Sequence, residues 1–177
     1  GDPADVATYV LTLDAINFGS GWFPTLRKRR GPDGHAVSGY FTVSWGLADR
    51  FRALGPWTNA ELRAMHTEEI ADVIGQPRGH ELMALFAQAL RQLGAFLGDR
   101  TALDVVANAG GSAVRLAEML AGGMSMFADR GFYKRAQITG SDLELAGVAS
   151  FGDVDRLTIF ADNLVPHVLR CDGVLVY

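Results

Sequence analysis

A single acid, Asp162, lies in a stretch that otherwise has the composition of a buried core, Leu157–Leu169. On a helical wheel the apolar residues of this stretch share one face, which predicts an amphipathic helix with Asp162 at the edge of that face. An unpaired carboxylate is costly to bury. The acid is therefore expected to be paired or capped, to reach solvent from the helix edge, or to take part in chemistry.

A second candidate for chemistry is Gly131–Ile138, where Phe132 and Tyr133 stand next to Lys134 and Gln137. Aromatic rings can stack on a base, a cation can hold a phosphate, and an amide can bond to base or sugar edges. The pattern is thus typical of a nucleotide pocket. It fits equally well an ordinary helix start, with rings facing inward and cations outward.

Asp14 and Asn17 lie near the end of a helix that apolar periodicity predicts over residues 5–18. Their spacing of three places both on the same side of a helix. The helix dipole disfavours an acid at a C-terminus, which makes Asp14 a candidate for a role other than solubility. The alternative is a turn asparagine beside a half-exposed aspartate.

Two further segments carry weaker signals for phosphate binding. Arg27–Arg30 places four cations before two turn dipeptides, and an exposed, solvated loop is favoured there because the protein as a whole is acidic. Gly110-Gly-Ser112 precedes a helix predicted over 113–120. Such a sequence can cradle a phosphate on backbone N–H groups, but a plain helix N-cap is favoured.

The pattern of apolar residues predicts a mainly α-helical, all-α fold with roughly eight helices. Helices are predicted over 38–54 and 80–97, and Thr58-Asn-Ala-Glu61 has the pattern of a capping box. Only Val174–Tyr177 has the composition of a strand. We expect one globular domain over residues 1–177, and we expect a fragment of a longer chain because it starts at Gly1 without a methionine and ends in an apolar tail.

Composition limits the classes of function. A net charge of −4 argues against a strong grip on a long polyanion, although not against binding of a single nucleotide. The one cysteine rules out an intramolecular disulfide and suits the cytoplasm. The four histidines share no metal-ligand spacing, cofactor fingerprints are absent, and no apolar run reaches the roughly 20 residues of a membrane span. We therefore predict no metal, no cofactor and no membrane association, and the oligomeric state stays open.

Three segments, Leu13–Phe18, Gly131–Ile138 and Thr158–Leu169, together resemble the marks of the queuosine salvage protein family in their order along the chain. Members of that family are queuosine 5′-monophosphate N-glycosylases, which release the base queuine. The resemblance spans the whole chain, and family members are longer at both ends. It implies a single domain similar to helix-hairpin-helix DNA glycosylases, a small-molecule substrate, no cofactor and no stable nucleic-acid complex.

The resemblance also implies roles for single residues. Asp162 would be the catalytic carboxylate, and Lys134 would contact the substrate or its phosphate. The expected substrate-binding residues are Asp14, Asn17, Phe18, Phe132, Tyr133, Lys134, Gln137 and Pro166. The chain departs from the family pattern just after the acid, with Asn163-Leu164 in place of Tyr-Arg and His167 in place of Gln.

Cleavage of an N-glycosidic bond passes through a sugar with oxocarbenium character, which a carboxylate can stabilise. Queuine is a 7-deazapurine, so its departure cannot be assisted by protonation at N7, and contacts on its other edges must stabilise it. Asp14 and Asn17 are the candidates for those contacts. Two other functions remain open: a nucleic-acid base-excision glycosylase, and a non-catalytic helical module that binds a nucleotide or a protein.

Overall fold

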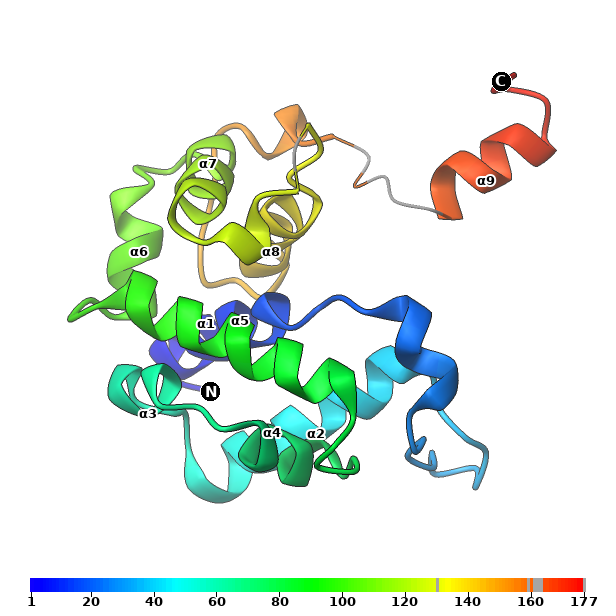
Figure 1. Cartoon of the computed structure of the whole chain (residues 1–177). Coiled ribbons are helices and arrows are strands. Elements are labelled where there is room, and N and C mark those ends of the chain that lie inside the picture. The colour runs from blue at the N-terminus through cyan, green and yellow to red at the C-terminus, as the bar shows by residue number, and fades with distance from the viewer. Residues whose placement is uncertain (130, 159, 161–163, 177) are drawn as a thin grey trace. The chain divides into compact units, whose positions relative to one another are not determined.

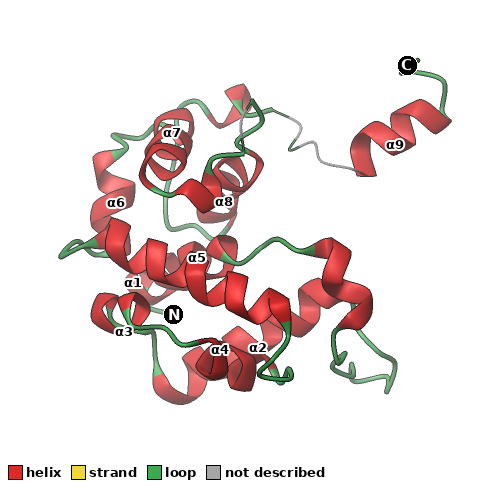
Figure 2. Ribbon diagram, viewed as in Figure 1, coloured by secondary structure: helices red, strands yellow, loops and turns green. Residues whose placement is uncertain are grey.

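The structure is a computed structural model of the chain that describes residues 1–129, 131–158, 160 and 164–176. The described residues form nine α-helices and three 3₁₀ helices, with one isolated bridge between Arg30 and Ala36 and no strand (Figures 1 and 2). The predicted mainly helical fold is therefore confirmed. The strand predicted at the C-terminus is wrong for its described part, residues 174–176.

The chain divides into two compact units, residues 1–105 and 106–177, and the boundary falls inside one helix, α6 (Ala102–Asn108). Each unit is described by itself. The single domain predicted from the sequence, and its similarity to helix-hairpin-helix glycosylases, stay predictions.

Unit 1 is built around its longest helix, which packs against three others. Its elements are α1 (Pro3–Ala15), η1 (Ser20–Thr25), α2 (Gly39–Leu54), α3 (Asn59–Arg63), α4 (Thr67–Ile74) and α5 (Glu81–Leu97). Helix α5, drawn in green in Figure 1, contacts α1, α3 and α4, and α2 contacts α1 and α4. The apolar face of α5 is largely buried, as the 3.6-residue period predicts, although Leu85 and Phe96 are only half-buried.

Capping residues set the starts of these helices. The Thr58 hydroxyl accepts a hydrogen bond from the Glu61 amide, and the Glu61 carboxylate accepts one from the Thr58 amide at 2.7 Å. The predicted capping box is therefore confirmed. Ser38 caps α2 in the same way, by accepting from the Phe41 amide. Each cap satisfies N–H groups that have no partner inside the helix.

The cationic run Arg27–Arg30 forms a loop that is held by its own contacts. The Gln76 side chain bonds to both the amide and the carbonyl of Arg27, and the Arg29 guanidinium pairs with Asp49 at 2.5 Å. Arg30 donates to the carbonyl of Gly34. The prediction of a loop is confirmed, and the guanidinium groups of Arg29 and Arg30 take part in contacts within unit 1.

Helices α3 and α5 approach closely because Gly94 lies where they cross. A Cβ atom at this position would lie 2.6 Å from the Arg63 amide nitrogen and 2.9 Å from the Asn59 carbonyl oxygen. Both are backbone atoms, which cannot rotate away. Glycine is therefore required at this point for the helices to pack at their observed separation.

Unit 2 contains a pair of packed helices, followed over residues 146–158 by a segment in which only one short 3₁₀ helix forms. After α6 come α7 (Ala113–Gly123), η2 (Ser125–Phe127), α8 (Lys134–Leu145), η3 (Val154–Arg156) and α9 (Leu164–Cys171). Helices α7 and α8 pack side by side, and η2 and η3 contact α7 (Figure 1). The buried side chains of the pair include Leu116, Leu120, Ala136 and Leu143, and Phe127 of η2 is buried with them.

The helix predicted over Leu157–Leu169 is wrong in its first part. Leu157 is extended, with φ −63° and ψ 147°, and Phe160 has a positive φ of 53°. The Thr158 amide donates to the side chain of Gln137 instead of to a carbonyl one turn back. Leu157 and Thr158 are thus held in a non-helical path, and the described helix begins at Leu164.

Replacing Gly94 with alanine is expected to lower the free energy of unfolding by about 1–3 kcal/mol, because the added methyl group collides with the backbone of α3. Urea unfolding followed by circular dichroism measures the change. Gly122→Ala is the matched control, since a Cβ there has no atom within 4 Å. The control is expected to be neutral or to stabilise by less than about 1 kcal/mol. Equal effects from both substitutions would contradict the close contact.

Candidate active site

The aromatic residues before α8 lie on a tight turn. Gly131 has φ 86°, and Tyr133 has φ 47° and ψ 36°. The backbone of Tyr133 is thus left-handed, a conformation that residues other than glycine rarely adopt. The Lys134 amide donates to the Asp129 carboxylate at 2.8 Å, which caps the start of α8. Phe132 and Tyr133 are 61% and 43% exposed. The predicted helix start is confirmed, but its rings do not face a core.

These two rings line a pocket of about 460 Å³ in unit 2. Its wall is formed by residues from α7, the turn before α8, α8 itself, η3 and the two residues after η3. The lining residues are Val114, Ala117, Glu118, Gly131, Phe132, Tyr133, Gln137, Arg156, Leu157 and Thr158. The volume lies within the usual range for small-molecule sites. The fold thus brings together three of the predicted substrate-binding residues.

Three of the lining residues were not identified as candidates from the sequence. Glu118 on α7 supplies a carboxylate, Arg156 on η3 supplies a cation, and Thr158 supplies a hydroxyl. Glu118 and Arg156 lie 38 positions apart in the sequence, so no local pattern links them. The pocket therefore carries both signs of charge next to its aromatic wall.

Gln137 joins the two sides of this pocket. Its Nε2 donates to the Phe132 carbonyl at 2.7 Å and to the Thr158 hydroxyl at 2.9 Å. Its Oε1 accepts from the Thr158 amide at 2.7 Å. The side chain is only 8% exposed. One buried amide thus connects the aromatic turn to the segment that leads toward Asp162.

The Gly110-Gly-Ser112 loop is a helix cap that is completed by a carboxylate. Asp153 accepts hydrogen bonds from the Ser112 hydroxyl at 2.5 Å and from the Ala113 amide at 2.6 Å. The hydrogen bond from Ser112, with those from the Ala113 and Val114 amides, holds the pKa of Asp153 below its ordinary value. The protein's own carboxylate therefore occupies the place that a phosphate would take, and the plain N-cap is confirmed.

Asp14, Asn17 and Phe18 lie in unit 1, at and after the C-terminal end of α1. Asp14 is 1% exposed, whereas Asn17 and Phe18 are half-buried. The Phe18 ring contacts Phe86 of α5 edge to face, with centroids 5.2 Å apart. Asp14 is thus buried, not half-exposed. The predicted meeting of these three residues with those of unit 2 around a base stays a prediction.

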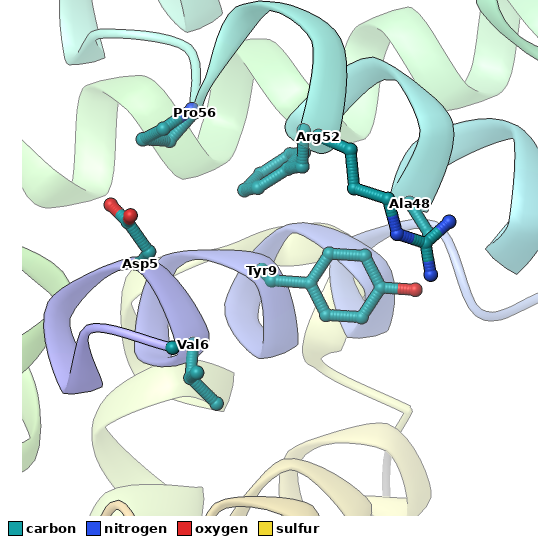
Figure 3. Close-up of a pocket in the computed structure, with 8 residues that line it drawn as sticks. Asp5, Val6, Tyr9, Ala48, Arg52 and Pro56 are labelled. Carbon is teal, nitrogen blue, oxygen red and sulfur yellow. The ribbon is translucent and has the colours of Figure 1, made fainter.

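Unit 1 has a hollow of about 540 Å³ beside Tyr9, which Figure 3 shows. The Tyr9 hydroxyl donates to the Ser44 carbonyl at 3.1 Å, and its ring packs edge to face on Phe51. Burial, assisted by Tyr40 and Asp14, raises the pKa of Tyr9 to about 12, while Arg52 opposes the shift. The phenol is therefore a protonated link between α1 and α2. Although this hollow is larger, we assign the candidate site to the pocket in unit 2, where the predicted residues gather.

The other predicted residues of unit 2 are close in sequence to residues that line the pocket. Lys134 is the first residue of α8 and is half-buried, and Pro166 lies in α9. The predicted catalytic acid, Asp162, lies outside the described residues. It follows Thr158 by four positions.

In the part of the chain that the structure describes, no three His, Cys, Asp or Glu side chains gather closely enough to hold a metal ion. Among the same residues, no helix combines the length and apolar character needed to span a bilayer.

Sequence comparison gives the relationship of the chain to known proteins. The profile of a family described as Queuosine salvage protein matches residues 1–177. The chain belongs to the queuosine salvage protein family. A curated relative, the queuosine 5′-phosphate N-glycosylase/hydrolase of Sphaerobacter thermophilus, is 34% identical over 188 aligned positions. That alignment covers 97% of this chain and 58% of the relative. This member of the family therefore spans somewhat more than half the length of the relative it matches.

Replacing Asp153 with asparagine is expected to destabilise the protein at pH 7 and to have less effect at low pH. The pKa of Asp153 is depressed in the folded state, so its contribution is present above the unfolded value of about 4 and is lost as the pH falls through the folded value. Urea unfolding of both proteins at pH 7 and pH 3 tests this. Asp155→Asn, at an exposed neighbour, serves as the control. A difference that is the same at both pH values would contradict the role of the charge.

Proposed function

We propose that this chain carries the substrate pocket and catalytic acid of an N-glycosylase that hydrolyses queuosine 5′-monophosphate to queuine and ribose 5-phosphate in the cytoplasm. The observation that carries the proposal is the pocket of unit 2. Its wall combines the aromatic turn with Thr158, which stands four residues before Asp162. Membership of the queuosine salvage family and the printed activity of the Sphaerobacter relative support the same reaction.

Asp162 is the proposed catalytic carboxylate. The four residues from Thr158 to Asp162 span at most about 14 Å. The acid is therefore within reach of a ligand bound in the pocket that Thr158 lines. In the reaction the bond between C1′ and N9 breaks, and the oxygen of water bonds to C1′. The carboxylate stabilises the positive charge on the sugar or accepts the proton of the attacking water. The departing base takes up one proton overall.

The chemical groups of the pocket match those of the proposed substrate. Phe132 and Tyr133 offer exposed faces on which a deazapurine can stack. Arg156 lines the pocket and is the proposed phosphate ligand, since a guanidinium forms paired hydrogen bonds with phosphate oxygens. Glu118 supplies a carboxylate for the cationic aminomethyl group of queuine. In this way an acidic protein can bind an anionic nucleotide that also carries a positive charge.

Two alternative functions receive less support. A base-excision glycosylase would use backbone N–H groups or cations to hold a nucleic-acid backbone. In unit 2 the N-terminus of α7 is occupied by Asp153, and the net charge of the chain is −4. Salt-sensitive binding to a duplex would nevertheless favour that function. A non-catalytic nucleotide-binding module would bind the nucleotide without turnover and would be indifferent to Asp162.

Asp162→Asn is expected to lower kcat at least about 100-fold, because the amide cannot balance the charge that develops on the sugar. The assay incubates purified protein with queuosine 5′-monophosphate and measures free queuine by liquid chromatography. Circular dichroism confirms that the variant is folded, and Asp155→Asn controls for loss of a nearby negative charge. Full activity of Asp162→Asn would refute the catalytic role. An inactive wild-type protein would count against the function itself.

Arg156→Gln is expected to raise KM for the monophosphate about 10- to 100-fold, since a hydrogen bond to a charged group is lost. The KM for the nucleoside queuosine, which has no phosphate, should change little. Steady-state kinetics with both substrates separates the two effects. Arg115→Gln is the matched control, because Arg115 is an exposed cation of the same unit outside the pocket lining. Equal losses with both substrates would show that Arg156 does not bind the phosphate.

A further inference from the structure

The side-chain amide of Gln137 already has protein partners for its hydrogen-bonding groups. A primary amide offers two N–H donors and one carbonyl oxygen. One donor bonds to the Phe132 carbonyl, the other to the Thr158 hydroxyl, and the oxygen accepts from the Thr158 amide. The side chain is also 92% buried. No N–H donor of this amide is left for the edge of a base or sugar.

The bond to Phe132 supports a turn that needs outside support. Tyr133, the next residue, has a left-handed backbone, a conformation that costs roughly 1–2 kcal/mol for a residue with a Cβ atom. Such conformations persist when neighbouring contacts hold them in place. Gln137 holds the peptide before Tyr133, and Asp129 holds the Lys134 amide after it. The direction in which the aromatic turn presents its rings therefore depends on these two side chains.

The bonds to Thr158 fix the other wall of the pocket. Thr158 is held through its amide and its hydroxyl, the latter also lying 3.2 Å from Gln137 Oε1. Two contacts to one residue define its orientation as well as its position. From here the chain runs on toward Asp162, four residues later. The same amide thus sets the aromatic wall and the start of the acid-bearing segment relative to each other.

We propose that Gln137 is a positioning residue, which holds the aromatic turn and Thr158 at a fixed position relative to each other. The rings that stack on the nucleobase and the segment that leads to Asp162 can then act on the same substrate molecule. This inference rests on the proposed function. Misplacing a reacting group by about 1 Å can cost about 100-fold in rate. Gln137 thus acts on kcat through its neighbours and does not touch the substrate.

Gln137→Glu tests the proposal through its pH dependence. An ionised glutamate keeps the acceptor for Thr158 but places a charged oxygen against the Phe132 carbonyl, whereas a protonated glutamate regains one donor. We expect kcat about 10- to 100-fold below wild type at pH 8, with KM changed less than about 3-fold. The ratio of variant to wild-type kcat should rise as the pH falls to 5. Gln88→Glu, at an exposed position of α5, is the matched control.

A second pair of variants leaves Gln137 in place. Thr158→Ser keeps the hydroxyl and is expected to lose less kcat than Thr158→Val. Thr158→Val removes it while keeping the side-chain shape, and is expected to lower kcat about 10-fold. Unfolding midpoints at each pH show that every assay uses folded protein. A raised KM with unchanged kcat, or a pH profile of Gln137→Glu parallel to wild type, would overturn the positioning role.

Hydrogen–deuterium exchange provides a test that does not need turnover. In folded Gln137→Leu, peptides that contain Thr158 and Tyr133 should exchange faster than in wild type, while peptides of α5 should be unchanged. Unchanged exchange at Thr158 and Tyr133 would overturn the inference whether or not the protein is active. Absence of queuine release by the wild-type protein would instead refute the proposed function.

Discussion

The structure of unit 2 depends on hydrogen-bond acceptors for the N–H groups of residues 151–158, a segment in which only η3 is helical. Leaving a buried N–H without a partner costs about 1–3 kcal/mol. Carboxylate and amide side chains on α8 supply the acceptors, with Glu144 bonded to the Phe151 amide and Gln137 bonded to the Thr158 amide, both at 2.7 Å. Asp153, on the segment itself, satisfies the start of α7 in return. These contacts fix the segment on the helix pair, and the pocket forms along it.

Most helices could be predicted because their signals are local. The apolar period of α5 and the capping box at Thr58 each lie within a few turns of chain, and both are confirmed. The helix expected over Leu157–Leu169 failed for the opposite reason. Its apolar period is genuine, but Thr158 is bonded to a residue 21 positions earlier, and a helical wheel cannot represent such a contact.

The candidate site could be predicted only in its contiguous parts. Phe132, Tyr133 and Gln137 stand within six positions of one another, so their types suggested a nucleotide pocket. Glu118 and Arg156 belong to the same lining but carry no local motif, because each resembles an ordinary surface charge. The sequence also could not show whether the Gln137 amide would bind a substrate or hold a turn of the protein. That distinction depends on which partners surround the side chain after folding.

At the left-handed turn of Tyr133 the backbone is held by hydrogen bonds, whereas the side-chain torsions of the two aromatic rings are not. Its backbone is anchored on both sides, so the entropy of ordering the loop is lost when the protein folds and not when a ligand arrives. The rings of Phe132 and Tyr133 extend from that anchored chain and remain about half exposed. Their torsions can adjust to the face of a heterocycle, whereas the backbone beneath them is held by hydrogen bonds on both sides. In the proposed substrate pocket, such a wall would favour flat heterocycles that differ in their substituents.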